Sequence, residues 1–501
     1  MKRFYSLIVF FCLCLTASAQ TQFGEKPRLV VGIVVDQMRW DYLDRYYNQF
    51  GNDGFKRLID QGYSCNNCLI NYVPTVTAIG HTSVYTGATP AFHGICGNNF
   101  VIKGKKVFSC QDDSEKAVGS NSKKGNCSPR NMLATTIGDQ LRLHTDFKSK
   151  VIGVSYKDRA SILPAGHSAN AAYWLDTKNL CFISSTYYMT ELPDYVKQVN
   201  KDIKTNVAVQ QLGDRIGYSP LCGTITTDMA IAALQGEHLG QGEATDMLCI
   251  SYSQTDVIGH EWGTRGSRTD DAYLSLDRDL GRLLKALDSQ VGEGNYLLFL
   301  TADHGASHNW NFLREHKLPG GPFYEGDIRT EAEKVIASKL GSTKPVILEQ
   351  QNYRFFLDRQ SIAEQGLSMD AVKDVLTDYL KTLPEVVTVI DFEKVRMAPV
   401  PAVLAQRILL GYYPERSGDV IAILLPHYIS WWDKAAPTHT THGLWNPYDS
   451  HIPLLFFGWH ISHGATSQEV HITDIAPTVC QMLHIQQPSA CIGEAIDKIA
   501  F

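Results

Sequence analysis

The chain has 501 residues, and its 44% hydrophobic and 20% charged residues are ordinary proportions for a folded globular protein. Its formal net charge is -6 and it has no long basic run, so nucleic acid is disfavoured as a main partner. An anionic small-molecule substrate is not excluded, because a bound metal ion can dominate the local field.

The first 19 residues read as a signal peptide. Lys2 and Arg3 precede an apolar stretch over residues 4–16, and small residues at 17–19 fit cleavage after Ala19. The stretch is short for a membrane span. The alternative is that it stays uncleaved as an anchor. No other apolar run is long enough to cross a bilayer. The sequence therefore predicts a periplasmic or secreted protein with no membrane span after cleavage. Export would allow disulfides among the ten remaining cysteines, but the sequence does not define their pairing.

Short runs of apolar residues recur along the mature chain, as expected for strands buried on both faces of a parallel sheet. The runs cover residues 29–35, 149–155, 247–252, 296–301, 419–425 and 452–457. Helical patterns alternate with them, near residues 52–61, 270–287 and 369–382. The alternation predicts an α/β fold with a mostly parallel central sheet and helices on both faces. Residues from about 160 to 245 and from about 320 to 415 read as cap insertions in a single catalytic domain over residues 20–501.

Acidic residues and histidines lie at the ends of these runs. They are Asp36 after the first run, Asp256 and His260 after the third, Asp303 and His304 after the fourth, and His442 before the last. Ligands of open α/β sheets bind beyond the carboxyl ends of the strands, so these side chains are expected to converge. Zinc binds imidazole nitrogen and carboxylate oxygen, and six such ligands suit a two-metal site for phosphoryl transfer. Taken singly, each aspartate could instead cap a helix, and each histidine could be an ordinary core residue.

A candidate nucleophile lies in residues 71–87, NYVPTVTAIGHTSVYTG. Thr77 is expected at or near the N-terminus of a helix, where free N–H groups and the helix dipole favour phosphate. Metal coordination could activate its hydroxyl. The alternative is that Thr75 or Thr77 only caps the helix.

Taken in order, several motifs resemble the alkaline phosphatase superfamily, and within it the single-threonine, phosphate-irrepressible branch. They are VVDQMRWDYL, PTVTAIGHTSVYTG, PAFHGICGNN, TDVIGHEWG, TADHG, THG and TDIAPTVCQML, and they span residues 29 to about 483. The chain is also similar to nucleotide pyrophosphatase/phosphodiesterases. The resemblance implies two zinc ions, one held by Asp36, Asp303, His304 and the Thr77 oxygen, the other by Asp256, His260 and His442. It also implies that Thr77 forms a covalent phosphothreonine, which water then hydrolyses.

The same resemblance points to phosphate monoesters as substrates. It implies that Asn98, Lys157 and Arg159 contact the phosphoryl oxygens, and a fork-shaped guanidinium suits a doubly charged monoester. The string PTVTAIGH lacks the CxPxR or SxPxR of sulfatases, so a sulfatase is disfavoured. The prediction is an alkaline phosphatase acting on small phosphate esters, with phosphate scavenging as its role. The alternatives are a phosphodiesterase/nucleotide pyrophosphatase with the same metal site and a non-catalytic zinc- or phosphate-binding protein. The sequence does not define the physiological substrate or the oligomeric state.

Overall fold

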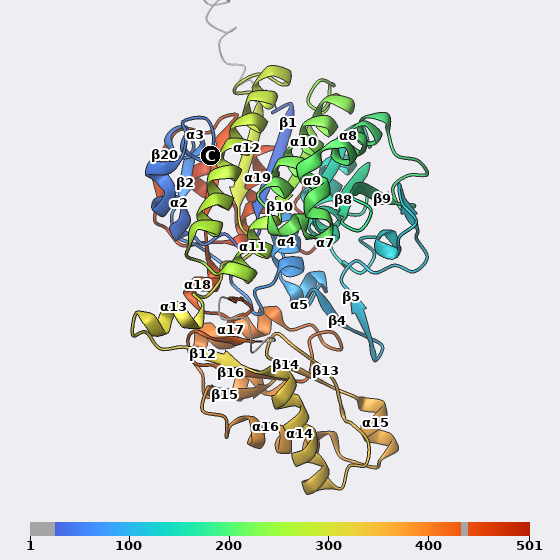
Figure 1. The fold of residues 1–501 in the computed structure, drawn as a ribbon, viewed down its shortest axis with the longest axis vertical. Helices are drawn as coiled ribbons and strands as arrows, with labels where there is room; N and C mark the ends of the chain where they lie inside the picture. The colour runs from blue at the N-terminus through green and yellow to red at the C-terminus, as the bar shows by residue number, and fades with distance from the viewer. Residues whose placement is uncertain (1–25, 432–438, 501) are drawn as a thin grey trace, which may run out of the picture.

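The computed structural model describes residues 26–431 and 439–500, so the predicted signal peptide lies outside the described residues. A ten-stranded sheet forms the centre of the molecule, in the order β20-β2-β19-β11-β1-β10-β7-β8-β9-β6 (Figure 1). Its middle five strands are parallel: β11 (Tyr296–Thr301), β1 (Leu29–Val35), β10 (Asp246–Tyr252), β7 (Val151–Ser155) and β8 (Ala171–Asp176). Antiparallel pairing adds β19 (Leu454–Gly458) and β2 (Tyr63–Cys65) on one side, and β9 (Cys181–Ser185) and β6 (Ala117–Val118) on the other. Strand β20 (Gly464–Thr466) closes one edge by pairing parallel with β2. The mostly parallel sheet predicted from the sequence is confirmed.

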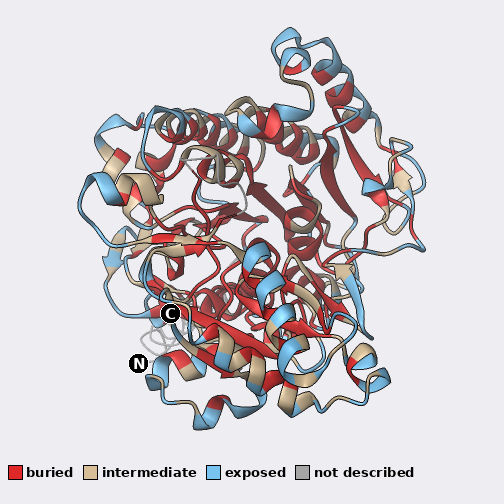
Figure 2. Cartoon of the chain, turned by 60° about the horizontal axis from the view of Figure 1, so that its bottom comes forward, coloured by how far each residue is buried: buried red, intermediate tan, exposed pale blue. Residues whose placement is uncertain are grey.

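Helices flank both faces of this sheet, so the middle strands are buried throughout (Figure 2). One layer contains α8 (Asp194–Thr205), α10 (Leu221–Gly236) and α12 (Ser267–Gln290). Another contains α4 (Thr77–Thr86), α7 (Asp158–Ala165) and α19 (Ile475–Met482). Burial on both faces explains why the strand sequences are continuously apolar rather than alternating.

A separate antiparallel sheet lies in the lower part of Figure 1, and we call it the small sheet region. Its strand order is β13 (Ile347–Gln351), β14 (Arg354–Leu357), β16 (Val420–Leu424) and β15 (Val386–Asp391). Helices α14 (Glu325–Leu340) and α16 (Met369–Leu380) cover it, with a hydrophobic cluster of its own. Strand β16 is the predicted run at 419–425, but it pairs in this sheet and not in the central one.

The two segments expected as insertions are placed differently. Residues 160–245 supply β8 and β9 to the central sheet, whereas most of 320–415 belongs to the small sheet region. The predicted run at 452–457 is divided at Pro453 into β18 (His451–Ile452) and β19, which pair with different strands. A single catalytic domain with insertions stays a prediction.

The ten cysteines in the described part of the chain are free thiols, nine of them buried. Within the same residues, no helix combines the length and the apolar character needed to cross a membrane.

Candidate active site and metal centre

Asp36, Asp303 and His304 form the first of two groups that could hold a metal ion, here called the inner group. Asp36 directly follows β1 and Asp303 follows the neighbouring parallel strand β11, so both leave the same edge of the sheet. All three side chains are fully buried. The Nε2 atom of His304 lies 3.6 Å from Oδ1 of Asp36 and 3.4 Å from Oδ2 of Asp303. This is the convergence predicted from the strand ends.

Asp256, His260 and His442 form the second group, here called the outer group. Asp256 and His260 lie one turn apart on α11 (Gln254–Trp262), which follows β10, and His442 lies in the loop before α18 (Pro447–Ser450). Nε2 of His260 is 3.1 Å, and Nε2 of His442 3.7 Å, from Oδ1 of Asp256. The His442 ring stacks on the His304 ring of the inner group with centroids 3.5 Å apart, so the two groups adjoin.

The histidines are oriented as metal ligands usually are. Nδ1 of His260 faces the carbonyl of Thr440, that of His442 the carbonyl of Thr75, and that of His304 the carbonyl of Gly305, at 2.6–3.0 Å. A carbonyl oxygen only accepts, so each Nδ1 donates, and a ring in its neutral form keeps a lone pair on Nε2. Burial lowers the pKa of His304 and of His442, which favours the neutral, ligating form.

The buried carboxylates of the inner group are not fully hydrogen-bonded. Oδ1 of Asp36 and Oδ2 of Asp303 make no hydrogen bond within the described residues. Burial, reinforced by the Asp303 carboxylate, holds the pKa of Asp36 well above its usual range. Burial opposes ionisation of Asp256 too, but His260 and Lys157 outweigh it and hold the pKa of Asp256 well below its usual range. Buried carboxylate oxygens beside imidazole lone pairs are a donor set that suits zinc.

Lys157 lies between the two groups. Its Nζ atom is 2.6 Å from Oδ2 of Asp36 and 2.6 Å from Oδ2 of Asp256, and the side chain is almost fully buried. Arg159, two residues later, is placed differently. Its guanidinium lies 3.6 Å from Oδ1 of Asp158 and stacks over the Phe108 ring at 5.6 Å.

Thr77 opens helix α4 beside the inner group. Its side chain is 1% exposed, and Oγ1 lies 3.5 Å from Nε2 of His304. Neither threonine caps the helix, since the capping position is Val76 and the Thr75 hydroxyl donates to the Leu444 carbonyl. Instead, Oδ1 of Asn98 accepts a hydrogen bond from the Ala78 N–H at 3.0 Å. The threonine hydroxyl, the helix N-terminus and Asn98 therefore meet in one place.

Three supporting residues were not predicted from the sequence. Gln37 adopts a left-handed backbone conformation (φ 63°), from which its N–H reaches Asp303 and its Nε2 reaches Asp256. His81 hydrogen-bonds the Thr77 carbonyl and lies 3.3 Å from Oδ2 of Asp303. Asp449 holds the His442 loop by accepting from the N–H groups of Gly443 and Leu444. The sequence offered a signal for Gln37, which directly follows Asp36, and for His81, which lies four residues after Thr77 in the motif PTVTAIGHTSVYTG.

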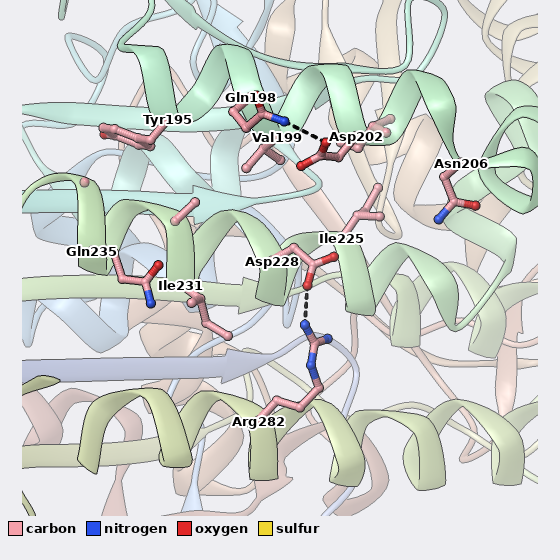
Figure 3. A pocket seen from close by; sticks show the side chains of 13 residues that line it. Tyr195, Gln198, Val199, Asp202, Asn206, Ile225, Asp228, Ile231, Gln235 and Arg282 are labelled. Atoms are coloured by element: carbon pink, nitrogen blue, oxygen red, sulfur yellow. Dashed lines mark hydrogen bonds and ion pairs between the residues drawn. The ribbon is translucent and has the colours of Figure 1, made fainter. Parts of the chain in front are cut away.

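A surface pocket of about 570 Å³ lies among α8, α10 and α12, away from these groups (Figure 3). Its lining includes the Asp228–Arg282 ion pair, and it contains none of the site residues predicted from the sequence. We assign it no part in the chemistry.

Comparison with known proteins places the chain among phosphate-ester hydrolases. Residues 30–445 match the family described as type I phosphodiesterase / nucleotide pyrophosphatase. Alkaline phosphatase PafA of Elizabethkingia meningoseptica is 41% identical over 96% of both chains. Alkaline phosphatase PhoV of Synechococcus elongatus is 41% identical over 99% of this chain and 98% of that protein. A crystal structure of wild-type alkaline phosphatase PafA matches with a TM-score of 0.91 and 40% identity, covering 95% of this chain and 100% of that one.

Proposed function

Because the chain belongs to the type I phosphodiesterase/nucleotide pyrophosphatase family of the alkaline phosphatase superfamily, we propose that it is an alkaline phosphatase that hydrolyses phosphate monoesters. One observation carries the proposal. The Thr77 hydroxyl adjoins the inner of two neighbouring groups of potential metal ligands, and the Lys157 ammonium lies between those groups.

Two zinc ions are the proposed cofactors, one in each group. Bound zinc supplies Lewis acidity, which favours an ionised nucleophile and neutralises charge on a leaving oxygen. The inner group, with the Thr77 oxygen, and the outer group would hold them. Gln37 keeps Asp303 and Asp256 in a fixed relation by a hydrogen bond to each.

Thr77 is the proposed nucleophile. Its Oγ1 attacks phosphorus in line, the bond from phosphorus to the ester oxygen breaks, and the alcohol leaves. Water then attacks the phosphothreonine, the Oγ1–phosphorus bond breaks and inorganic phosphate departs. The N-terminus of α4 faces the phosphoryl group in both steps and stabilises its negative charge.

Lys157, Arg159 and Asn98 select the substrate in this proposal. The Lys157 ammonium is already within the site, and Asn98 keeps its Nδ2 as a donor because its Oδ1 accepts from Ala78. Arg159 would have to turn away from Phe108 to reach a phosphoryl oxygen. Positive charge of this kind favours a dianionic monoester over a singly charged diester. The predicted signal peptide is the only basis for proposing export. An exported phosphatase could release phosphate from esters outside the cytoplasm, which is the proposed scavenging role.

Replacing Thr77 tests the nucleophile. We expect Thr77→Ala to lower kcat for an aryl phosphate monoester by about 10⁴-fold or more and to abolish labelling of the protein by substrate phosphate. Thr86→Ala, at the far end of the same helix, is the matched control and should retain turnover. Full turnover by Thr77→Ala would refute the assignment.

The phosphodiesterase alternative is tested with a matched pair of substrates. We expect kcat/KM for an aryl phosphate monoester to exceed that for its methyl diester, because the diester has one negative charge fewer. A larger kcat/KM for the diester would favour the alternative. A protein that binds zinc but hydrolyses neither ester would instead be the non-catalytic binder.

A further inference from the structure

Arg354, the first residue of β14 in the small sheet region, is an unusual buried cation. Its side chain is 0% exposed, yet Nε, Nη1 and Nη2 make no hydrogen bond within the described residues. Burial lowers its pKa to about 10, so the guanidinium is still charged at neutral pH. A buried, unpaired charge is costly, and proteins keep such groups mainly where they serve function.

The guanidinium lies against the loop that contains Asn98. Nη2 would be only 3.1 Å from a Cβ atom at position 97, so the missing side chain of Gly97 lets the cation approach the backbone next to Asn98. The guanidinium carbon also lies 5.5 Å from the centre of the Phe356 ring. Packing thus fixes Arg354 between its own strand and the residue that precedes Asn98.

Neighbouring residues of the small sheet region hold the same loop. The hairpin of β4 (Asn99–Ile102) and β5 (Lys105–Phe108) lies beside β13 and β14 (Figure 1). Nε2 of Gln351 donates to the Asn99 carbonyl, and Glu349 pairs with Lys106 at 2.6 Å. The Ser109 N–H closes the base of the hairpin on the Asn98 carbonyl. The backbone on both sides of Asn98 is therefore fixed from outside the central sheet.

We propose that Arg354 is a positioning residue that acts through Gly97 to hold Asn98 against the N-terminus of α4. The inference rests on the proposed function, because the role of Asn98 is to receive a phosphoryl group there. Asn98 accepts from the Ala78 N–H of α4 and lies in the loop directly before β4, so its position depends on how that loop is held. Loss of the guanidinium would leave the hairpin attached by Gln351 and Glu349 but free to shift at Gly97.

A double-mutant cycle tests this role. We expect Arg354→Met to lower kcat/KM for an aryl phosphate monoester by about 10–100-fold, the range seen when groups that orient ligands are removed. In an Asn98→Ala background the same substitution should cost less than about 2-fold, because positioning has no target there. Arg354→Lys should recover part of the loss. Equal losses in both backgrounds, or none in the wild type, would overturn the inference.

Two further measurements separate positioning from folding and from failure of the proposed function. Lys373→Met removes another buried cation of the small sheet region, one paired with Asp391 and Glu393, and should lower the melting temperature but spare kcat/KM. Inorganic phosphate binding, measured by calorimetry, should weaken in Arg354→Met and not in Lys373→Met. A wild-type protein without monoesterase activity would refute the proposed function, whereas unchanged phosphate affinity in Arg354→Met would overturn only this inference.

Discussion

The inner and outer groups contain the same elements, carboxylate and imidazole, but are built differently. The inner group stands on two neighbouring parallel strands and is wholly buried. Helix α11 and the loop before α18 supply the residues of the outer group. The His260 side chain in this group is 25% exposed. The sheet itself fixes the inner group, whereas the outer group depends on hydrogen bonds that His442 and His260 donate to the carbonyls of Thr75 and Thr440. Thr77 adjoins the inner group, so the proposed nucleophile lies beside the wholly buried group, and the group that contains His260 is the more exposed one.

Metal removal should have the largest effect on turnover, and it should distinguish the inner group from the outer group. We expect exhaustive chelation to abolish turnover and added zinc to restore it, with about two ions bound per chain. Because the outer group is more exposed, its ion should leave first, so metal content should fall in two phases. Metal analysis alongside activity during chelator dialysis measures both. A metal-free protein at full activity would contradict the two-zinc proposal, and loss in a single phase would contradict the difference between the groups.

Substitution of single candidate ligands should show how much activity depends on each group. We expect Asp303→Asn and His260→Gln each to lower kcat/KM by more than about 100-fold, the upper end for groups that only support a ligand. The loss should be larger for Asp303→Asn, because this residue also contacts His304, His81 and the Gln37 N–H. Asp271→Asn, an exposed carboxylate on α12, is the control. Comparable losses for His260→Gln and the control would remove His260 from the centre.

The sequence indicated the position of His442 less directly than that of the other five candidate ligands, for a physical reason. β1 was predicted with its observed bounds, and a residue that follows a parallel strand must lie at one edge of the sheet. Nothing local indicates that the His442 loop folds back to Thr75, so His442 rested on resemblance to a family motif. Its neighbour His439 hydrogen-bonds the His260 carbonyl and is as buried, so composition alone could not separate them.

Long-range pairing and backbone conformation explain what the sequence did not predict. β16 was predicted as a strand, but its partners β14 and β15 are set by tertiary contacts, which apolar runs do not encode. Gln37 supports both groups only because its φ angle is positive, a conformation that few residues other than glycine adopt. Arg354 lies within residues 320–415, which the sequence indicated only as a cap insertion. Its burial becomes visible only when the small sheet region packs against the Asn98 loop.

Asp449 offers the prediction with the smallest effect on turnover, and it tests how the outer group is held. Burial raises the pKa of Asp449 to about 8, although the N–H groups of Leu444 and Gly443 oppose the rise. An unfolded chain would ionise it near 3.8, so its contribution to stability is complete below about pH 4 and is lost as the pH rises to about 8. The substitution Asp449→Asn would keep an acceptor for the loop without an ionisable group.

We therefore expect the stability of Asp449→Asn relative to wild type to increase between about pH 4 and pH 8, by at most about 6 kcal/mol. Turnover should fall by no more than about tenfold, since the His442 loop keeps its bond to Thr75. Urea unfolding of both proteins at pH 5 and pH 8 measures the difference, with Asp271→Asn as the exposed control. A stability difference that does not vary with pH would show that Asp449 is ionised in the folded protein. The loop that contains His442 would then be held by a charged, not a neutral, hydrogen-bond acceptor.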